Sequence, residues 1–463
     1  MDYRGHIHSI FNRINSNLMV PTIRERKRHL LNLKNWINEN RQQIIDTLYT
    51  DLGKPEPEVE LAEIWYVLSE IKLARRKLSQ WAKPKKVGTS TSTLFTASSY
   101  IHYEPKGVVL IIAPWNFPFN LAIGPLVSAI AAGNKVIIKP SELAKSTSEL
   151  IERMVKEIFD PEYVTVFQGG VEISETLLEL PFNHIFFTGS PTVGKKVMSK
   201  ASNNLSSITL ELGGKSPTII DQTANLDLAV KKIIWGKFIN AGQSCIAPDY
   251  ILVQDLIKEK FIQKIKDRLN FVFGKTAQEK ELSPDYGRIV NKDHWKRLNK
   301  LLEIAQVEGA NIVCGGDVNE LKNYIAPTIL DNINPEMKLM REEIFGPLLP
   351  IISYQSLEKC LSIIHGLPNP LALYIFSNSK HNITEIIQKT SSGSVVINEV
   401  KTQFTNLKLP FGGVNHSGIG SSHGQFGFQS FSNYRSILKN GKRSIVVLTF
   451  PPYNRFKKKL IRF

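Results

Sequence analysis

One cysteine and one glutamate in this sequence have the residue types and neighbours that thiol chemistry needs. Cys245 closes the run of residues 240–245, shortly after Gly242, and Glu211 opens an upstream run that contains Gly213 and Gly214. A thiolate attacks a carbonyl carbon, and the thioester that follows needs a base to activate water. A carboxylate beside glycines supplies that base on a backbone that bends close to a ligand. The pair predicts covalent catalysis.

The other two cysteines fit the usual interpretation of a lone cysteine, which is a small buried apolar side chain. Cys314 follows the apolar pair Ile312 and Val313, and Cys360 lies in an apolar helical pattern. The surroundings of Cys245 fit that interpretation poorly. We therefore predict that Cys245 is the nucleophile.

Asn116 is a candidate oxyanion donor. It lies between Pro114 and Pro118, directly after an apolar strand. The two prolines fix the backbone and so aim the amide, and a fixed amide stabilises an oxyanion together with a backbone N–H. Without the other runs, a simple turn asparagine would be the better interpretation.

A phosphate site is predicted where residues 188–196 end a strand and open a helix. Ser190 is a good N-cap and Pro191 a good first helical residue, so free N–H groups face an anion. An ordinary capped helix fits this segment equally well. The run also matches the start of a P-loop, but Lys196 stands where that motif needs Ser or Thr. The glycine-rich loop of residues 418–424 lacks a preceding strand and counts for little.

Two further runs bring charged side chains to places where a cofactor can lie. Lys139 and Glu142 follow a strand and offer a cation and an acid to a ribose. Glu343 and Phe345 lie in the run of residues 340–347, which is also compatible with a plain loop after a helix.

Composition argues against several other classes of protein. The ten histidines are scattered without a His-x-x-x-His pair, and the Gly-x-Ser-x-Gly run of residues 420–424 follows no apolar strand, so we expect neither a metal nor a serine mechanism. The net charge of +16 is dispersed, so we expect no nucleic-acid partner. Three cysteines indicate a reducing, cytoplasmic setting. We expect no signal peptide and no membrane span, which would need an apolar run of roughly 18 residues.

Apolar patterning predicts an α/β fold. Residues 22–82 have helical spacing with a break at 53–55, and residues 88–105 predict an exposed β-hairpin that reaches a partner subunit. Apolar strands then alternate with helices, which is typical of parallel sheets whose ligands bind at the carboxyl ends of the strands. Beyond Gly214 a second alternation indicates a second α/β domain. Strands are expected at 108–112, 135–139, 163–167, 184–188, 218–221 and 250–253, and helices at 146–158, 173–180 and 228–238.

Seven runs, in order and over nearly the whole chain, make this sequence resemble the aldehyde dehydrogenase superfamily. They are residues 114–116, 139–142, 187–190, 211–215, 242–245, 343–347 and 409–413. The short lead before Val108, the continuation after Cys245 and the segment 451–453 resemble the class 3 branch, which includes fatty and aromatic aldehyde enzymes. Two positions depart from the family: Asn415 stands where glycine is usual, and Ser244 replaces a commoner threonine.

The resemblance implies an α/β fold with a Rossmann-type cofactor domain, an α/β catalytic domain and a small β bridging element for oligomerisation. The domain boundaries that it implies are residues 1–87 and 106–212 for the NAD(P)-binding domain, 213–400 for the catalytic domain, 88–105 and 401–445 for the bridging element, and 446–463 for a basic C-terminal tail. A homodimer is expected.

The resemblance also implies a reaction. Cys245 attacks an aldehyde, Asn116 and the Cys245 backbone N–H stabilise the oxyanion, a hydride passes to the cofactor, and Glu211 activates water to release a carboxylic acid. NAD is the expected cofactor, with NADP tolerated. The cofactor-binding residues that the resemblance implies are Trp115, Lys139, Glu142, Gly189, Ser190, Val193, Gly194, Leu212, Glu343 and Phe345.

Two alternatives to this reaction are open. A dehydrogenase that acylates coenzyme A needs no base to activate water, so Glu211 argues against it. A binding protein that kept the fold and lost catalysis is the other, and the intact Cys245, Glu211 and Asn116 argue against that.

The basic end of the chain raises the question of membrane contact. Residues 454–463 combine five basic side chains with four apolar ones and no acid. At helical spacing such a segment lies on an anionic membrane. A strand or coil that covers the enzyme is the interpretation favoured, because ten residues make a short anchor.

Overall fold

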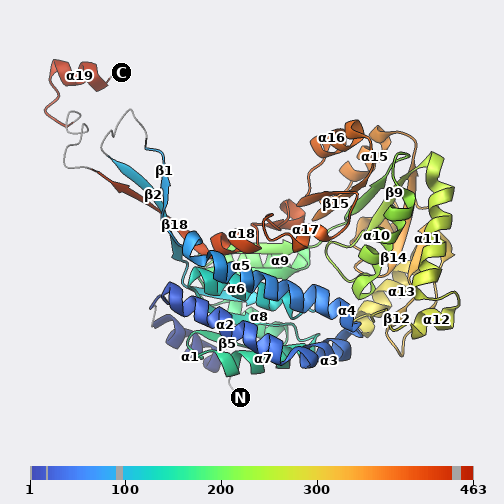
Figure 1. Ribbon diagram of the computed structural model, residues 1–463, viewed down its shortest axis with the longest axis horizontal. Coiled ribbons are helices and arrows are strands. Elements are labelled where there is room, and N and C mark those ends of the chain that lie inside the picture. Colours follow the sequence, from blue (N-terminus) through green and yellow to red (C-terminus); the bar gives the residue numbers. More distant parts are fainter. Residues whose placement is uncertain (1–2, 17–18, 90–96, 441–449, 462–463) are drawn as a thin grey trace.

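The computed structural model describes residues 3–16, 19–89, 97–440 and 450–461. Within them the expected α/β fold is confirmed. Two mainly parallel sheets lie beside one another, each covered by helices, and a small antiparallel sheet projects from one side (Figure 1).

The first sheet has six strands in the order β17–β7–β6–β3–β4–β5, and only β17 is antiparallel to its neighbour. The chain adds β4 and β5 on one side of β3 and then β6 and β7 on the other. Ligands bind at the crevice where the strand order reverses in this way, which here lies between β3 and β6. The strands are β3 (Val108–Ile112), β4 (Lys135–Lys139), β5 (Val164–Val166), β6 (His184–Gly189), β7 (Ser207–Leu212) and β17 (Gly418–Ile419).

Helices cover both faces of this sheet, because alternate residues of its buried strands point to opposite layers. Val109 and Ile111 pack with α2, α3, α5, α6 and α7, whereas Val108 and Leu110 pack with α1, α8 and α9. The bounds are α1 (Tyr3–Ser16), α2 (Ile23–Glu39), α3 (Arg41–Leu52), α4 (Glu56–Val59), the π-helix η1 (Glu60–Ile64), α5 (Trp65–Trp81), α6 (Asn120–Ala132), α7 (Lys145–Ile158), α8 (Val171–Leu178), α9 (Pro191–Ser202) and α18 (Gly424–Ser430).

The second sheet has seven strands in the order β10–β13–β14–β9–β8–β15–β16, and only β10 is antiparallel to its neighbour. The strands are β8 (Pro217–Ile220), β9 (Tyr250–Gln254), β10 (Asn311–Cys314), β13 (Thr328–Asp331), β14 (Leu348–Tyr354), β15 (Ala372–Phe376) and β16 (Ser394–Ile397). A separate two-stranded sheet is formed by β11 (Val318–Asn319) and β12 (Tyr324–Ile325).

The helices of this second half pack around the seven-stranded sheet as one apolar core. Their bounds are α10 (Leu226–Phe238), η2 (Ile239–Gly242), η3 (Asp255–Ile257), α11 (Lys258–Phe273), α12 (Ala277–Leu282), α13 (Lys292–Val307), α14 (Lys338–Arg341), α15 (Leu357–His365), α16 (Lys380–Lys389) and α17 (Thr402–Thr405). The short helix η4 (Asn415–Ser417) instead contacts β7 of the first sheet.

The third sheet projects from the body of the molecule (Figure 1) and has the order β1–β2–β18. β2 (Ser98–Pro105) pairs with β1 (Lys85–Val87) on one side and along its full length with β18 (Ser432–Lys439) on the other. The hairpin expected at 88–105 thus has its second strand in place, while residues 90–96 lie outside the described residues.

The C-terminal tail differs from the favoured expectation of a strand or coil over the enzyme. Its described part forms the helix α19 (Arg455–Ile461), which stands at the far end of the projection (Figure 1). The segment after Asn454 lacks the alternating pattern of a strand. Residues 457–460 are four consecutive residues with good helix propensity, which favours a helical turn. Among the described residues, no helix has both the length and the apolar character to cross a membrane.

The predicted domain boundaries remain a prediction, although the sheets show how the segments are used. Residues 85–87 pair within the small sheet rather than with the first large sheet. Within the segment 401–445, Gly418–Ile419 pairs with β7, and α18 packs against α5 and α6. Within residues 401–440, the described part of that segment, only β18 belongs to the small sheet.

Candidate active site

The loop that carries Cys245 is bent by three consecutive residues in left-handed conformation. Asn240, Ala241 and Gly242 have φ values of 53°, 51° and 77° at the end of α10. Asn tolerates this conformation, and Gly adopts it freely. A Cβ on Gly242 would collide with the carbonyl of Gly346. Glycine at position 242 therefore allows both the left-handed conformation and the close approach of the loop to the backbone of Gly346.

Gln243 fixes this loop from inside. Its amide nitrogen donates to the carbonyls of Asn240 at 3.0 Å and Arg288 at 2.9 Å, and its side-chain oxygen accepts from Val290 N at 3.0 Å. Because the side chain is fully buried, the loop before Cys245 has one well-defined conformation. No separate role for Gln243 was predicted from its position in the run of residues 240–245.

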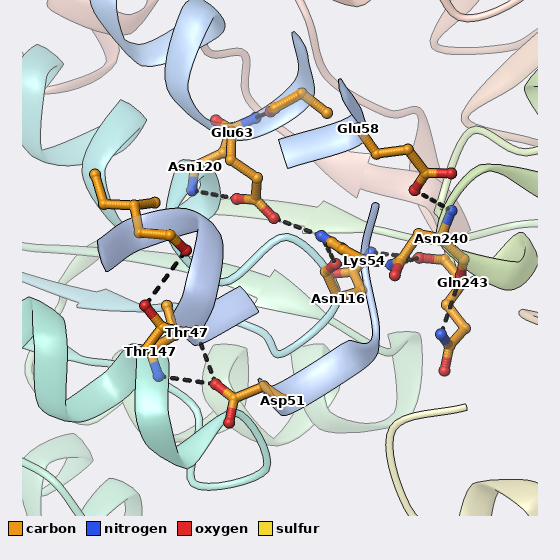
Figure 2. A network of polar contacts seen from close by, with 12 residues as sticks. Thr47, Asp51, Lys54, Glu58, Glu63, Asn116, Asn120, Thr147, Asn240 and Gln243 are labelled. Carbon is orange, nitrogen blue, oxygen red and sulfur yellow. Dashed lines mark hydrogen bonds and ion pairs between the residues drawn. The ribbon is translucent and has the colours of Figure 1, made fainter. Parts of the chain in front are cut away.

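Asn116 lies against the cysteine loop, as the oxyanion hypothesis requires. Its Nδ2 donates to the backbone carbonyl of Gln243 at 3.1 Å, and its own backbone carbonyl accepts from Asn240 Nδ2 at 2.8 Å. Figure 2 shows these side chains converging from different parts of the chain. Asn116 and the segment before Cys245 are thus held together as one unit.

The buried ion pair between Lys54 and Glu63 holds the backbone of Asn116 in this unit. Lys54 Nζ contacts Glu63 Oε1 and donates to the backbone carbonyl of Asn116 at 2.7 Å, while Glu63 Oε2 accepts from Asn120 N at 2.8 Å (Figure 2). Both side chains are almost inaccessible. Burial lowers the pKa of Lys54, and Glu63 opposes that effect. Sequence reasoning treated residues 53–55 only as a helix break and missed this pair.

Glu211 lies buried at the end of β7. Its Oε1 accepts from Ser422 Oγ at 2.9 Å, and Oε2 has no hydrogen-bond partner among the described residues. Burial raises the pKa of Glu211 to about 8, and the Ser422 hydrogen bond works against that rise. A carboxyl with a pKa near ambient pH is suited to take up a proton.

The glycine-rich loop of residues 418–424, which counted for little in the sequence, supplies Ser422. Gly418 pairs with Glu211 as β17 joins the edge of the first sheet. Asn415, where the family usually has glycine, has a φ of 54°. Asparagine tolerates that left-handed conformation, so this substitution keeps the backbone course of the loop.

Cys245 lies between two adjoining pockets. The first, called here the Glu211 pocket, has about 550 Å³ of space, part of it open solvent, and is lined by Glu211, Ser422 and Cys245 among others. The second, called the Lys401 pocket, has about 620 Å³ of space, also partly open solvent, and is lined by Cys245, Lys401 and mainly apolar side chains. The predicted nucleophile and the predicted base therefore line one cavity.

The three cysteines differ in their surroundings, although Cys314 is less buried than predicted from the sequence. All are free thiols; Cys360 is buried in α15, Cys314 is half-buried at the end of β10, and only Cys245 lines these pockets. Burial, followed by Glu343 and Glu211, raises the pKa of Cys245 to about 12, and Lys401 opposes this rise. The thiol is therefore protonated at neutral pH, so its attack needs a proton acceptor or a nearby positive charge.

The cofactor residues expected from the first domain gather at one edge of the first sheet. Lys139, Gly189 and Leu212 end the strands β4, β6 and β7, and Trp115 follows β3. Parallel neighbours end on the same edge, which is where such sheets bind ligands. The sequence runs that looked isolated are thus neighbours along that edge.

The helix after β6 starts as predicted. Ser190 is the N-cap and accepts from Val193 N at 3.4 Å, with Pro191 as the first helical residue. A Cβ on Gly194 would lie 2.8 Å from the Leu212 side chain, so α9 packs closely on β7 at this end. The free N–H groups of this helix start are suited to a phosphate.

Lys139 and Glu142, which were expected to offer a cation and an acid to a ribose, contact each other. Lys139 Nζ forms an ion pair with Glu142 Oε2 at 2.5 Å. The ammonium is buried, whereas the carboxylate side chain is 39% exposed. The short spacing along the chain after β4 explains the contact, and it gives this corner no net charge.

The second half of the molecule contributes Glu343 and Phe345. Glu343 is half-buried, its Oε1 has no partner among the described residues, and burial raises its pKa to about 8. The ring of Phe345 meets Trp115 edge-on at 5.3 Å, which joins the two halves. Asp249 holds this segment by accepting from Ile344 N at 3.0 Å.

These residues fit a dinucleotide. A capped helix start follows β6 beside the crevice of the first sheet, and Glu343 Oε1 is a buried acceptor with no partner among the described residues. Ribose hydroxyls are the donors that such an acceptor needs. Among the described residues, no group of three or more side chains could hold a metal ion.

A doubly wound sheet with a capped helix at its switch point, beside a second α/β half that presents a thiol, defines a nicotinamide-dependent oxidoreductase. The chain belongs to the aldehyde dehydrogenase family, whose sequence profile matches residues 19–437. It is an NAD(P)-dependent aldehyde dehydrogenase.

Three similar proteins illustrate the relationship. The 4,4′-diaponeurosporen-aldehyde dehydrogenase of Staphylococcus aureus is 46% identical over 92% of this chain and 92% of its own length. The rat dimeric NADP-preferring aldehyde dehydrogenase is 43% identical over 88% of both chains. The structure of the substrate-bound state of Staphylococcus aureus AldH matches with a TM-score of 0.94 at 44% identity, covering 98% of each chain. Members of aldehyde dehydrogenase family 3 are among the other relatives, as the class 3 resemblance predicted.

Proposed function

We propose that this enzyme oxidises aldehydes to carboxylic acids through a thioester on Cys245. The observation that carries the proposal is that Cys245 and Glu211 line one cavity, while Asn116 is bonded to the loop before the thiol. These are the nucleophile, the base and the oxyanion donor that the reaction requires.

The first step joins Cys245 to the aldehyde. Its Sγ gives its proton to solvent water and bonds to the carbonyl carbon, and the carbonyl oxygen becomes an oxyanion. Asn116 Nδ2 and the Cys245 backbone N–H donate to that oxygen. A bound NAD(P)⁺ supplies the acceptor for the hydride that leaves the carbon, and a thioester remains on Cys245.

The second step releases the acid. Glu211 takes a proton from water, whose oxygen attacks the thioester carbon, and the carbon–sulfur bond breaks. Transfer to coenzyme A is the alternative fate of the thioester. It needs no carboxylate base, so a buried Glu211 with one unpartnered oxygen favours water.

The test follows nicotinamide absorbance with several aldehydes, with and without coenzyme A. We expect turnover that does not depend on coenzyme A and that Cys245→Ala abolishes, while Cys314→Ala and Cys360→Ala keep it. Activity that persists after complete alkylation of Cys245 would assign the nucleophile elsewhere.

For the cofactor we propose that NAD is preferred and NADP tolerated. Glu142 can accept from the ribose hydroxyls, and its charge disfavours a 2′-phosphate. The Lys139 ion pair reduces that repulsion, which supports tolerance. The rat relative is NADP-preferring by name, so both cofactors occur among similar enzymes.

We further propose a homodimer in the cytoplasm. The small sheet projects from the body (Figure 1), and it leaves the strand β18 largely exposed for a partner. The rat relative is dimeric by name. Three free cysteines support a reducing compartment.

Peripheral membrane contact through α19 is also proposed. Its described residues include four basic side chains and Phe456, which is 67% exposed. A helix with this composition suits an anionic lipid surface.

A further inference from the structure

Lys401 is the one charged side chain among the described residues that line the Lys401 pocket. It precedes α17 with a φ of 61°, a left-handed conformation that non-glycine residues rarely adopt. Only 8% of the residue is exposed. This local backbone brings a cation into a cavity that is otherwise apolar or neutral.

The Lys401 ammonium has no hydrogen-bond partner among the described residues. Its Nζ lies 5.9 Å from the centre of the Phe117 ring, and the pocket wall around it also includes Leu121, Trp235 and Phe404. An ammonium carries three donors and needs acceptors. A ligand in this pocket is therefore the group that can supply them.

Lys401 Nζ makes no ion pair or hydrogen bond with a carboxylate among the described residues. Lys54 pairs with Glu63, Glu58 accepts from Asn240 N at 2.8 Å, and Lys237 Nζ likewise has no hydrogen-bond partner in the described part of the chain. Burial lowers the pKa of Lys401 to about 7; Cys245 and Glu58 raise it, and Lys54 and Lys237 lower it further. The amine is thus partly charged near neutral pH, and its charge has no anionic partner within hydrogen-bonding distance among the described residues.

We propose that Lys401 is a specificity-determining residue that selects aldehydes carrying a carboxylate, with an apolar body between the two groups. The inference rests on the proposed function, because it places the aldehyde carbon at Cys245 in the same pocket. A carboxylate forms charge-assisted hydrogen bonds with the ammonium, and the methylene chain contacts the apolar wall. An aldehyde ending in methyl leaves the donors of Lys401 unpaired.

The selection weakens as pH rises. The carboxylate binds the ammonium form, and in the free enzyme this form is lost as pH rises through about 7. The groups that face Lys401 are Cys245, Glu58, Lys54 and Lys237. Only the first of them lines the pocket with it.

The test compares aldehydes matched in length. Butanal is paired with 4-oxobutanoate, and octanal with 8-oxooctanoate, using the full-length enzyme and its Lys401→Met variant, whose unbranched side chain is one atom shorter and uncharged. We expect the ratio of kcat/KM, carboxylate over methyl, to fall at least about tenfold in Lys401→Met at one or both lengths. Lys401→Arg keeps the cation and should keep a ratio above that of Lys401→Met. Lys145→Met removes an exposed lysine on α7 outside the pocket and should leave the ratio unchanged.

A uniform loss with all four aldehydes would overturn the proposal and assign Lys401 to ionisation of the Cys245 thiol. An unchanged ratio in Lys401→Met at both lengths would also overturn it. A readout without turnover keeps the two proposals apart: the thermal shift produced by octanoate and by octanedioate. If no aldehyde is oxidised, the proposed function fails, whereas a larger shift with octanedioate that Lys401→Met removes still supports Lys401, and equal shifts contradict it.

Discussion

Ser422 Oγ donates a 2.9 Å hydrogen bond to Glu211 Oε1, and this contact ties the loop of residues 418–424 to the end of β7. The other oxygen of Glu211 has no partner among the described residues. Since burial raises the pKa of Glu211 to about 8, the carboxyl stands near its protonation point with one oxygen able to take a proton. The contact therefore sets both the orientation and the basicity of the proposed base.

Glu211→Gln should separate the two chemical steps. The amide keeps the size of the side chain but takes no proton, so the thioester forms and persists. We expect a single-turnover burst of reduced cofactor, followed by a steady state slower by roughly 10²–10⁴-fold. Rapid-mixing absorbance measures the burst, and mass spectrometry detects the acyl group on Cys245. Steady-state turnover at the native rate would show that another residue activates the water.

Ser422→Ala should shift the pH profile. The hydrogen bond from Ser422 lowers the pKa of Glu211, so its loss raises that pKa. The base acts in its ionised form, and kcat for hydrolysis therefore rises as pH rises through about 8 in the native enzyme and at a higher pH in the variant. The measurement is kcat against pH under conditions where acid release limits the rate. Ser199→Ala, on the exposed surface of α9, is the control, and coincident profiles for Ser422→Ala and the native enzyme would contradict the prediction.

The sequence predicts those parts of the fold and of the candidate site that depend on a local pattern of residues. The continuous apolar runs of β3 and β4 predict strands buried on both faces, and the structure has them at the expected bounds. The start of α9 is also a local signal, because Ser190 caps the helix and Pro191 suits its first position. Cys245 stands out because its glycine-bearing loop is unlike the setting of a core cysteine.

Other parts of the site could not be read locally. Lys54 contacts Asn116 across 62 positions of the chain, and Ser422 reaches Glu211 across 211. Neither partner carries a pattern that names the other. Lys401 reaches its pocket from a backbone position with a positive φ. The sequence does not predict a left-handed conformation for a lysine. These contacts depend on tertiary packing between segments that lie far apart in the sequence.

Lys54→Met should destabilise the enzyme more than the double variant Lys54→Met with Glu63→Gln. Removing one partner of a buried ion pair leaves an uncompensated charge and costs about 3–5 kcal/mol, whereas replacing both partners restores much of the loss. Urea unfolding gives the free energy of unfolding for both. A surface control is Lys145→Met, whose ion pair with Glu149 is exposed. Equal stability of Lys54→Met and the native protein would show that the pair contributes nothing.

The C-terminal helix should bind anionic lipid. Each basic residue near an anionic surface contributes about 1 kcal/mol, and α19 includes Arg455, Lys457, Lys458 and Lys459. We expect the full chain to sediment with anionic vesicles and a chain ending at Pro452 to stay in solution. Neutral vesicles and high salt should release the full chain. Equal pelleting of both chains would rule out a role for the helix.

Glu142→Gln should move the cofactor preference toward NADP. In the structure Glu142 balances the buried ammonium of Lys139 at the end of β4, so the amide leaves a positive charge beside the expected ribose. That charge attracts a 2′-phosphate, and a unit charge at a few ångströms is worth about 1 kcal/mol or more at a partly exposed site. We therefore expect the ratio of kcat/KM for NADP over NAD to rise on the order of tenfold. Glu149→Gln, an exposed change on the following helix α7, should leave the ratio as it is. A native enzyme that prefers NADP, or an unchanged ratio in Glu142→Gln, would place Glu142 away from the ribose.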